Sequence, residues 1–347
     1  MHVISVSNVN SALRHGLEHL KNHGSVEHSR NGRVLVAPTP VATVYGHPTQ
    51  RVLFSPLRDA NPFFHYVESM WMIAGFNDVK TPAQFARQME YYTDDGSTLN
   101  GAYGYRWRRF FGYDQLGEIV RILQRDPTSR RCVLAMWSGS HDLRDQTSKD
   151  LPCNTHIYFR VVDGCLDMTV CCRSNDIVWG AYGANSVHMS MLQEYMALRI
   201  GVSVGTYTQL SFNYHLYLGR QDVDRLYNHA TGVVSYETED RYFTEVHMVP
   251  AKPLFMRGNE DEHSIFFEEV SHLILNGPGR AMRQSYVNDS VRNVLWPLMA
   301  AHEFYRIGDV DSAIIETESI DAVDWRTACR EWLQRRKAAR MAAEVAK

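Results

Sequence analysis

LPCNTHIYFRVVDGCLDMTVCCRSNDIVWGAYGAN, residues 151–185, is the stretch of this sequence that decides its fold class. It contains two runs of mainly apolar and β-branched residues, 156–162 and 166–173, separated by Asp163-Gly164, a pattern typical of a β-hairpin. The thiol of Cys153 precedes the first run. Arg173 ends the second run and is followed by a hydroxyl, an amide and a carboxylate. The order of these groups suggests a nucleophile that faces an anionic, amide-bearing ligand.

Helices and further strands are expected on both sides of this hairpin. Asn61-Pro62 at the start and Gly75 after the end predict a helix that carries Glu68 on a mostly apolar surface. Other helices are expected at 9–24, 82–92, 115–125 and 186–200, and other strands at 33–44, broken by Pro38 and Pro40, at 132–137 and at 206–218. The combination indicates a mixed α/β (α+β) body.

The pattern changes beyond about residue 260, where only helices are expected. They fall at 262–275, 288–305 and 321–345, and the last is dense in Arg, Lys and Ala. We therefore expect a domain at 1–255 that holds the sheet and a helical C-terminal extension at 256–347.

Composition narrows the class of protein. The chain has 347 residues and a net charge of −3 with its 16 His neutral, so it lacks the strongly basic character of duplex-binding proteins. Its six Cys form no CxxC pair, and no signal peptide or apolar run of about twenty residues is evident. We expect a reduced, cytoplasmic protein that binds no membrane, metal or nucleic acid.

Cys153 is the candidate nucleophile. A cysteine is more often an inert buried residue, but the positive charge of Arg173 would favour the thiolate, and a thiolate can attack an electron-poor ring carbon. Cys171 and Cys172 lie inside an apolar strand run and are interpreted as packing residues.

Glu68 has two readings of nearly equal weight. It is either a carboxylate satisfied by a nearby backbone group or Arg, or a carboxyl whose pKa is raised by burial so that it moves protons near neutral pH. Arg130-Arg131, before a strand, suit a phosphate but could be merely exposed. His215 and Tyr217 would point to the same side of a strand and suit a sugar hydroxyl, with structural capping as the alternative.

Several motifs between Glu68 and Tyr217 resemble thymidylate synthase and its relatives, the pyrimidine nucleotide hydroxymethylases. In chain order they are Glu68-Ser69-Met70-Trp71 with Gly75, Gly101-Ala102-Tyr103-Gly104 with Trp107-Arg108, Asp126-Pro127 with Ser129-Arg130-Arg131, Pro152-Cys153, Arg173-Ser174 with Asp176, Gly180 with Asn185, and His215-Leu216-Tyr217. The resemblance covers a little under half of the chain and makes 1–255 the expected catalytic domain.

The resemblance implies a role for each matching residue toward the nucleotide. Cys153 would add to carbon 6 of a pyrimidine nucleotide, Glu68 would move protons on the base through water, and Tyr103 would lie near carbon 5. The residues expected to bind the 5′-phosphate are Arg173 and Ser174 of one subunit with Arg130 and Arg131 of the other. A homodimer would therefore complete each active site.

The same resemblance implies 5,10-methylenetetrahydrofolate as the co-substrate, with no metal. Asp176 matches the carboxylate that contacts the pterin ring, and Arg58 falls where the family has a basic residue near the folate tail. Trp71 is also placed among the folate-binding residues. His215 and Tyr217 match the pair that binds the sugar 3′-hydroxyl.

Base preference is expected to depend on Asn185. An amide can donate to the carbonyl at position 4 of uracil and accept from its ring N–H, whereas a carboxylate would suit cytosine. This favours dUMP over dCMP. The interval from Gly180 to Asn185 is one residue longer than is usual in the family, and a displaced Asn185 would bring Ala184 or Ser186 to the base instead.

Other departures from the family pattern concern the product. Asn154 replaces the usual His after the nucleophile, no folate-stacking Trp is evident at 89–95, and the chain ends in Glu344-Val345-Ala346-Lys347 rather than a short apolar tail. Looser closure over the folate favours attack by water over hydride transfer. We therefore favour a dUMP hydroxymethylase that makes modified DNA precursors in a phage-infected cell. Thymidylate synthase and a dCMP hydroxymethylase are the alternatives.

A hypothesis of another class is an inactive protein of this fold that binds nucleic acid or a partner through its basic C-terminal helix. The residues concerned are Arg330, Arg335, Arg336, Lys337 and Arg340. A solvated helix face also explains these charges, and the presence of Cys153, Glu68, Tyr103 and Arg173 together argues for activity.

Overall fold

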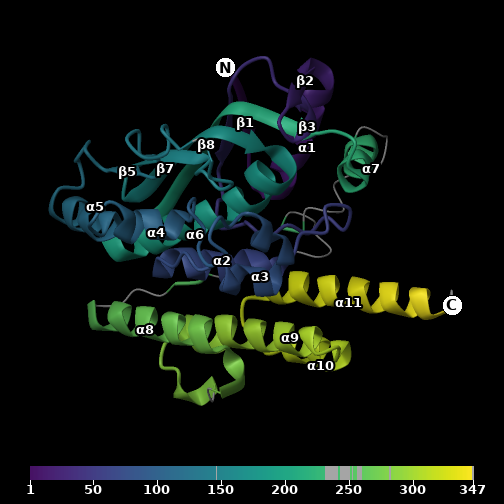
Figure 1. Cartoon of the computed structure of the whole chain (residues 1–347). Helices are drawn as coiled ribbons and strands as arrows, with labels where there is room; N and C mark the ends of the chain where they lie inside the picture. Colours follow the sequence, from purple (N-terminus) through teal and green to yellow (C-terminus); the bar gives the residue numbers. More distant parts are fainter. Residues whose placement is uncertain are drawn as a thin grey trace.

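A mixed eight-stranded sheet forms the centre of the chain (Figure 1). The computed structural model describes residues 1–145, 147–230, 241–242, 251, 253–255, 260–280 and 283–345. The strands are β1 (His2–Val6), β2 (Ser25–Ser29), β3 (Gly32–Val36), β4 (Val41–Tyr45), β5 (Val133–Ala135), β6 (Asn154–Val162), β7 (Cys165–Asp176) and β8 (Ser203–Tyr217). Six of them run in the order β1-β4-β8-β7-β6-β5, and β3 joins the β2–β3 hairpin to β8.

The hairpin predicted within residues 151–185 is formed by β6 and β7. These strands are antiparallel, and the turn residues Asp163 and Gly164 have φ angles of 48° and 75°, in the left-handed region that a tight hairpin turn requires. β7 and β8 are parallel, and helix α6 (Asn185–Ile200) makes the crossover between them. A sheet with both kinds of pairing and packed helices confirms the α/β fold class.

Helices pack against the sheet and against one another in layers (Figure 1). Besides α6, the helices of the first part are α1 (Val9–His23), α2 (Pro62–Ala74), α3 (Lys80–Phe85), α4 (Tyr103–Tyr105), α5 (Gln115–Arg125) and α7 (Gln221–Ala230). The C-terminal helices are α8 (Glu260–Asn276), α9 (Trp296–Arg306), α10 (Val310–Thr317) and α11 (Val323–Val345). The helical character expected beyond residue 260 is confirmed.

Helix α2 is buried on all sides. Its start is fixed by Asn61, whose Oδ1 accepts the N–H of Phe64 at 3.2 Å, and by Pro62, while Gly75 ends it with a φ of 79°. One side of α2 contacts α6, and other sides contact α8, α9 and α11 (Figure 1). This double cover explains why the sequence of α2 is apolar almost throughout.

The basic residues of α11 have partners within the chain. Arg330 pairs with Glu318, Arg335 and Arg336 both pair with Asp59, Lys337 pairs with Asp311, and Arg340 donates to the carbonyl oxygen of Gly308. These contacts explain the charges of α11 as internal links, and they weaken the hypothesis of a nucleic-acid-binding tail.

Some elements differ from the prediction. The strand expected at 33–44 is divided into β3 and β4, as Pro38 and Pro40 suggest, and the helix expected at 82–92 is divided into α3 and a 3-10 helix, Arg87–Tyr91. Strands β1 and β2 were not predicted. β2 is exposed at every residue, so it lacks the apolar alternation that reveals a strand. Within the described ranges, no helix combines the length and apolar character of a membrane span.

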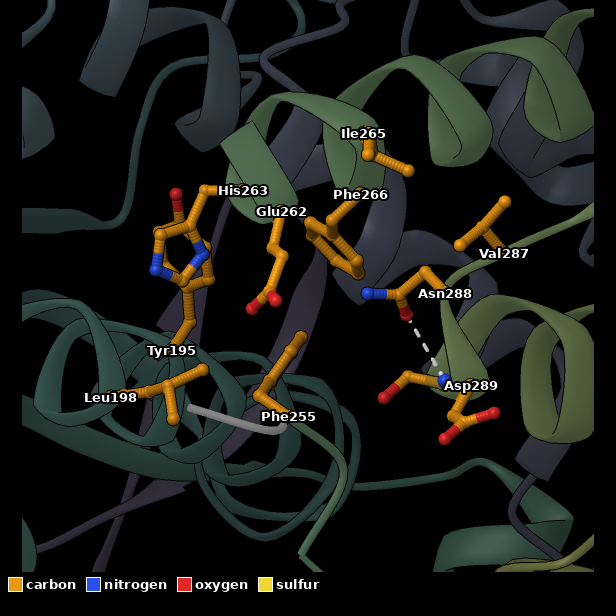
Figure 2. Close-up of a pocket in the computed structure, with 11 residues that line it drawn as sticks. Tyr195, Leu198, Phe255, Glu262, His263, Ile265, Phe266, Val287, Asn288 and Asp289 are labelled. Atoms are coloured by element: carbon orange, nitrogen blue, oxygen red, sulfur yellow. Dashed lines mark hydrogen bonds between the residues drawn. The ribbon is translucent and has the colours of Figure 1, made fainter. Parts of the chain in front are cut away.

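A cavity of about 240 Å³ lies at the junction of α6, α8 and residues 287–290 (Figure 2). Its walls are Tyr195, Leu198, Phe255, Glu262, His263, Ile265, Phe266, Val287, Asn288, Asp289 and Ser290. Glu262 points into the space between the rings of Tyr195 and His263 on one side and Phe266 on the other (Figure 2). No residue expected to take part in catalysis lines this cavity, so it is a separate feature of the helical junction.

Candidate active site

Cys153 lies directly before β6, and the hairpin brings Arg173 beside it. The backbone N–H of Arg173 donates to the carbonyl oxygen of Cys153 at 2.9 Å, and the Nη2 of Arg173 lies 3.9 Å from the Sγ of Cys153. The Nε of Arg173 also donates to the carbonyl oxygen of Pro152 at 2.9 Å. The thiol is half-buried and the guanidinium is exposed, so an anionic ligand could reach the cation from solvent.

Burial decides the acidity of this thiol. Desolvation raises the pKa of Cys153, Arg173 and Arg30 lower it, and Asp150 raises it, with a net shift upward. The predicted effect of Arg173, which favours the thiolate, is present, but the effect of burial on the pKa is larger.

Arg30 is a candidate functional residue that the sequence analysis missed. It lies in the turn between β2 and β3, and its charge lowers the pKa of Cys153, so it is close to the thiol in space. A basic residue in an Arg-Asn-Gly turn was the available signal. The pairing of β3 with β8, which carries this turn to the site, could not be read from the sequence.

Tyr103 holds the backbone around the nucleophile. Its hydroxyl oxygen accepts the N–H groups of Cys153 and Asn154, both at 3.2 Å, and burial raises its pKa well above 10, so it remains a phenol. Gly104 permits this position, because a Cβ there would lie 1.9 Å from the carbonyl oxygen of Met72 in α2.

Glu68 lies on α2 in contact with a histidine that the sequence analysis did not single out. The Oε2 of Glu68 is 3.1 Å from the Nε2 of His188 on α6, and both side chains are buried. Burial, with a smaller contribution from Asp150, raises the pKa of Glu68 to about 8. Burial lowers the pKa of His188 to about 3, so at neutral pH the imidazole is uncharged and the contact is not an ion pair. The raised pKa agrees with the second reading of Glu68, and its role in moving protons stays a prediction.

We expect a falling limb near pH 8 in the pH profile of kcat/KM. The Glu68 carboxyl carries its proton below that pH and loses it above, and only the protonated form can donate. In Glu68→Gln the limb should disappear and kcat should fall by about 10²–10⁴-fold, because an amide cannot transfer the proton. Glu318→Gln, which removes an exposed carboxylate, should leave the profile unchanged. A limb that persists in Glu68→Gln would assign it to another group.

Asp176 and His215 are neighbours across the parallel pair β7 and β8. The Oδ1 of Asp176 accepts the N–H groups of Val178 at 3.0 Å and Trp179 at 2.7 Å, whereas its Oδ2 is buried and, among the described residues, has no hydrogen-bond partner. The Nδ1 of His215 is also buried and, among the described residues, also has no hydrogen-bond partner. Buried polar atoms of this kind are normally satisfied, so both are available to a ligand.

Arg58 lies beside Asp176. Its Nε donates to the carbonyl oxygen of Val178 at 2.7 Å. Burial lowers the pKa of Arg58 to about 10, and Asp176 opposes this shift most strongly among its charged neighbours. The ring of Tyr217 packs edge-on against His215, with centroids 5.2 Å apart. Four of the five residues expected to bind the folate or the sugar therefore form one group: Arg58, Asp176, His215 and Tyr217.

Asn185 begins α6 and is linked to the residue after the nucleophile. Its Oδ1 accepts from the Nδ2 of Asn154 at 3.0 Å. The preceding segment, Ile177–Ala184, is helical but interrupted by a kink at Tyr182 and Gly183, whose φ and ψ angles are not helical. The hydroxyl of Ser186 donates to the carbonyl oxygen of Gly183. The structure thus places Asn185, rather than Ser186, beside Asn154.

The remaining residues predicted for the site are Arg130, Arg131, Trp71 and Ser174. Arg130 and Arg131 are exposed after α5. Trp71 is 1% exposed and its Nε1 donates to Asp78 at 2.9 Å, so in this structure it is a core residue without a surface for the folate. Ser174, by contrast, is partly exposed next to Arg173.

A mixed sheet that carries a thiol beside a guanidinium, with a buried carboxyl of raised pKa, has the groups that nucleophilic catalysis by cysteine requires. A sequence profile of the thymidylate synthase family matches residues 57–253. The chain is 42% identical over 352 residues to a protein of Pseudomonas phage M6 named deoxyuridylate hydroxymethyltransferase, covering 98% of this chain and 95% of that protein. The chain belongs to the thymidylate synthase family, as its motifs predicted.

Two further relatives are more distant. A deoxyuridylate hydroxymethyltransferase of Bacillus phage SP01 is 33% identical over 217 residues, which cover 58% of this chain and 55% of that protein. A putative thymidylate synthase of Methanothermobacter thermautotrophicus is 31% identical over 170 residues, which cover 47% of this chain and 72% of that protein.

Proposed function

We propose that this protein is a deoxyuridylate hydroxymethyltransferase, which converts dUMP to 5-hydroxymethyl-dUMP. The observation that carries this proposal is the 42% identity with the phage M6 protein of that name, which extends over 98% of the chain and so includes the C-terminal helices. The family makes the protein a one-carbon transferase. The phage relatives support a role in the cytoplasm of an infected cell.

The reaction begins at the pair formed by Cys153 and Arg173. The thiol of Cys153 loses its proton to water, its sulfur forms a bond to carbon 6 of the uracil ring, and the displaced π electrons move toward the oxygen at position 4. The protonated carboxyl of Glu68 supplies a proton to that oxygen through water, which leaves carbon 5 electron-rich. Tyr103, through the N–H groups of Cys153 and Asn154, keeps the sulfur in position during the attack.

The one-carbon group comes from 5,10-methylenetetrahydrofolate, which supplies a methylene at the oxidation level of formaldehyde. The residues near Asp176 fit this co-substrate, because the unpaired Oδ2 of Asp176 can accept from the N–H groups of a pterin and Arg58 supplies a nearby cation. His215 and Tyr217 would hold the sugar hydroxyl of the nucleotide. Carbon 5 forms a bond to this methylene and loses its proton to solvent, and the bond between the methylene and the folate nitrogen breaks, which releases tetrahydrofolate. Water then adds to the exocyclic methylene group, and the bond between the sulfur of Cys153 and carbon 6 breaks, which releases the hydroxymethyl product and restores the thiol.

The phosphate site and the quaternary structure are proposed together. Arg173 and Ser174 would hold the 5′-phosphate with Arg130 and Arg131 of the partner subunit. Apolar side chains exposed on one face of the sheet support a homodimer, since Val133, Tyr158 and Phe212 remain 43%, 47% and 73% exposed. The strand register places all three on the same face. An apolar surface of this kind is typical of a protein interface.

Product analysis tests the function. After incubation of the protein with dUMP and methylenetetrahydrofolate, mass spectrometry should find a nucleotide one oxygen heavier than thymidylate, together with tetrahydrofolate. Formation of thymidylate and dihydrofolate would identify a thymidylate synthase instead. Turnover of dCMP in preference to dUMP would identify a dCMP hydroxymethylase.

A further inference from the structure

Three asparagines form a continuous chain of hydrogen bonds next to the nucleophile. The Nδ2 of Asn154 donates to the Oδ1 of Asn185 at 3.0 Å, and the Nδ2 of Asn185 donates to the Oδ1 of Asn175 at 3.0 Å. The Nδ2 of Asn175 then donates to the hydroxyl oxygen of Ser211 at 2.9 Å. The exposed fractions of Asn154, Asn175 and Asn185 are 0%, 1% and 7%. The chain connects β6, β7, α6 and β8, and its central member is the residue expected to read the base.

The direction of this chain fixes which way the amide of Asn185 faces. Its Oδ1 is turned to Asn154 and its Nδ2 to Asn175, and each atom keeps one further hydrogen-bonding position, a lone pair on the oxygen and one N–H on the nitrogen. Gly180 packs against this arrangement, because a Cβ there would lie 2.7 Å from the Oδ1 of Asn175. The direction matters because an amide reversed by 180° exchanges its donor and its acceptor.

Uracil and cytosine differ by the same exchange. Uracil presents a ring N–H donor at position 3 and a carbonyl acceptor at position 4, whereas cytosine presents a ring acceptor and an amino donor. A fixed amide therefore matches one base and opposes the other, and a reversed amide has the opposite preference. Recognition of this kind discriminates strongly, because the wrong partner leaves buried polar groups unpaired.

We propose that Asn154 and Asn175 are positioning residues that set base preference by holding the amide of Asn185 in the direction that reads uracil. In this proposal, Asn154 and Asn175 do not contact the base themselves. Each acts through its hydrogen bond to the side chain of Asn185. The proposal rests on the proposed function only in taking dUMP as the natural substrate. It assigns to Asn154 a role in specificity.

Two matched variants, one on each side of Asn185 in the series of hydrogen bonds, test the proposal. Both change an amide to a carboxylate, which accepts hydrogen bonds and cannot donate them. In Asn154→Asp the carboxylate would face the Oδ1 of Asn185, so the amide should reverse and donate to it. In Asn175→Asp the carboxylate would accept from the Nδ2 of Asn185 as the amide does now, and the hydroxyl of Ser211 would donate to it, so the direction should be kept.

The measured quantity is the ratio of kcat/KM for dUMP to kcat/KM for dCMP. We expect it to fall by about 10–100-fold in Asn154→Asp and to stay within about threefold of the wild-type ratio in Asn175→Asp. A purely structural role would lower activity toward both nucleotides and leave the ratio unchanged. An unchanged ratio in Asn154→Asp, or an equal fall in both variants, would overturn the proposal.

A second variant protects the test against misfolding. Asn154→Leu has a similar volume and removes the donor to Asn185 without adding charge, so only the bond to Asn175 is left to hold the direction of the amide, and the preference for that direction should weaken. Calorimetric titration with dUMP and with dCMP, without folate, should show their affinities converging, and equal discrimination to wild type would contradict the proposal. If wild-type protein binds neither nucleotide, the proposed function is wrong. If it binds dUMP selectively and both position-154 variants keep that selectivity, only the present inference is wrong.

Discussion

Replacement of Cys153 by alanine should reduce turnover by more than about 10³-fold, since the variant lacks the sulfur that forms the bond to carbon 6. Nucleotide binding should remain measurable because the guanidinium of Arg173 and the Asn185 amide are retained. Release of the folate product measures turnover, and calorimetric titration with dUMP measures binding. Cys165→Ala removes a partly buried thiol from the start of β7 and should keep wild-type activity. Turnover by Cys153→Ala at the wild-type rate would remove the nucleophile assignment.

The same variant reports on the shared active site. Arg131→Ala alone should have weak activity if the arginine reaches the phosphate of the other subunit. When Cys153→Ala and Arg131→Ala proteins are mixed and allowed to exchange subunits, each mixed dimer would contain one intact site. Activity should then rise toward about a quarter of the wild-type value, the fraction of intact sites in a random mixture of dimers. No recovery would show that Arg131 acts within its own subunit or not at all.

Deletion of residues 256–347 should prevent the rest of the chain from folding. The division into a catalytic domain at 1–255 and a separate helical extension is a prediction from composition, but the contacts of α2 point to a single folding unit. Phe63 packs edge-on against Trp332 of α11 with centroids 5.7 Å apart, and Tyr66 against Trp325 at 5.0 Å. Removal of these partners would expose one apolar side of α2 to water. Such exposure lowers the stability of the folded state by roughly 25 cal/mol for each Å² of apolar surface.

Point variants measure how much the contacts between α2 and the C-terminal helices stabilise the fold, without truncation of the chain. Trp325 is 1% exposed, and Trp325→Ala should lower the free energy of unfolding by about 3–5 kcal/mol. Ile315, on α10, is 72% exposed, and Ile315→Ala should change it by less than about 0.5 kcal/mol. Denaturant titration followed by circular dichroism gives both values. Cooperative unfolding of a soluble 1–255 fragment would show instead that the C-terminal helices are a separable domain.

Local sequence signals predicted much of the fold because their causes are local. The turn at Asp163-Gly164 needs only two residues that tolerate positive φ, and the start of α2 needs only the Asn61 cap and Pro62. The failures have the same origin. β2 carries no apolar alternation, and its place in the sheet depends on pairing with β3, so no pattern within its five residues could reveal it.

The sequence alone determined the chemical identity of the site: the thiol of Cys153, the cation of Arg173, the carboxyl of Glu68 and the amide of Asn185, in the order that marks the family. Only the tertiary structure decided how these groups behave. The net acidity of Cys153, the contact of Glu68 with His188 and the direction of the Asn185 amide each depend on atoms from separate strands and helices. Desolvation and hydrogen-bond direction are set by everything that surrounds a side chain, whereas sequence motifs record only its neighbours along the chain.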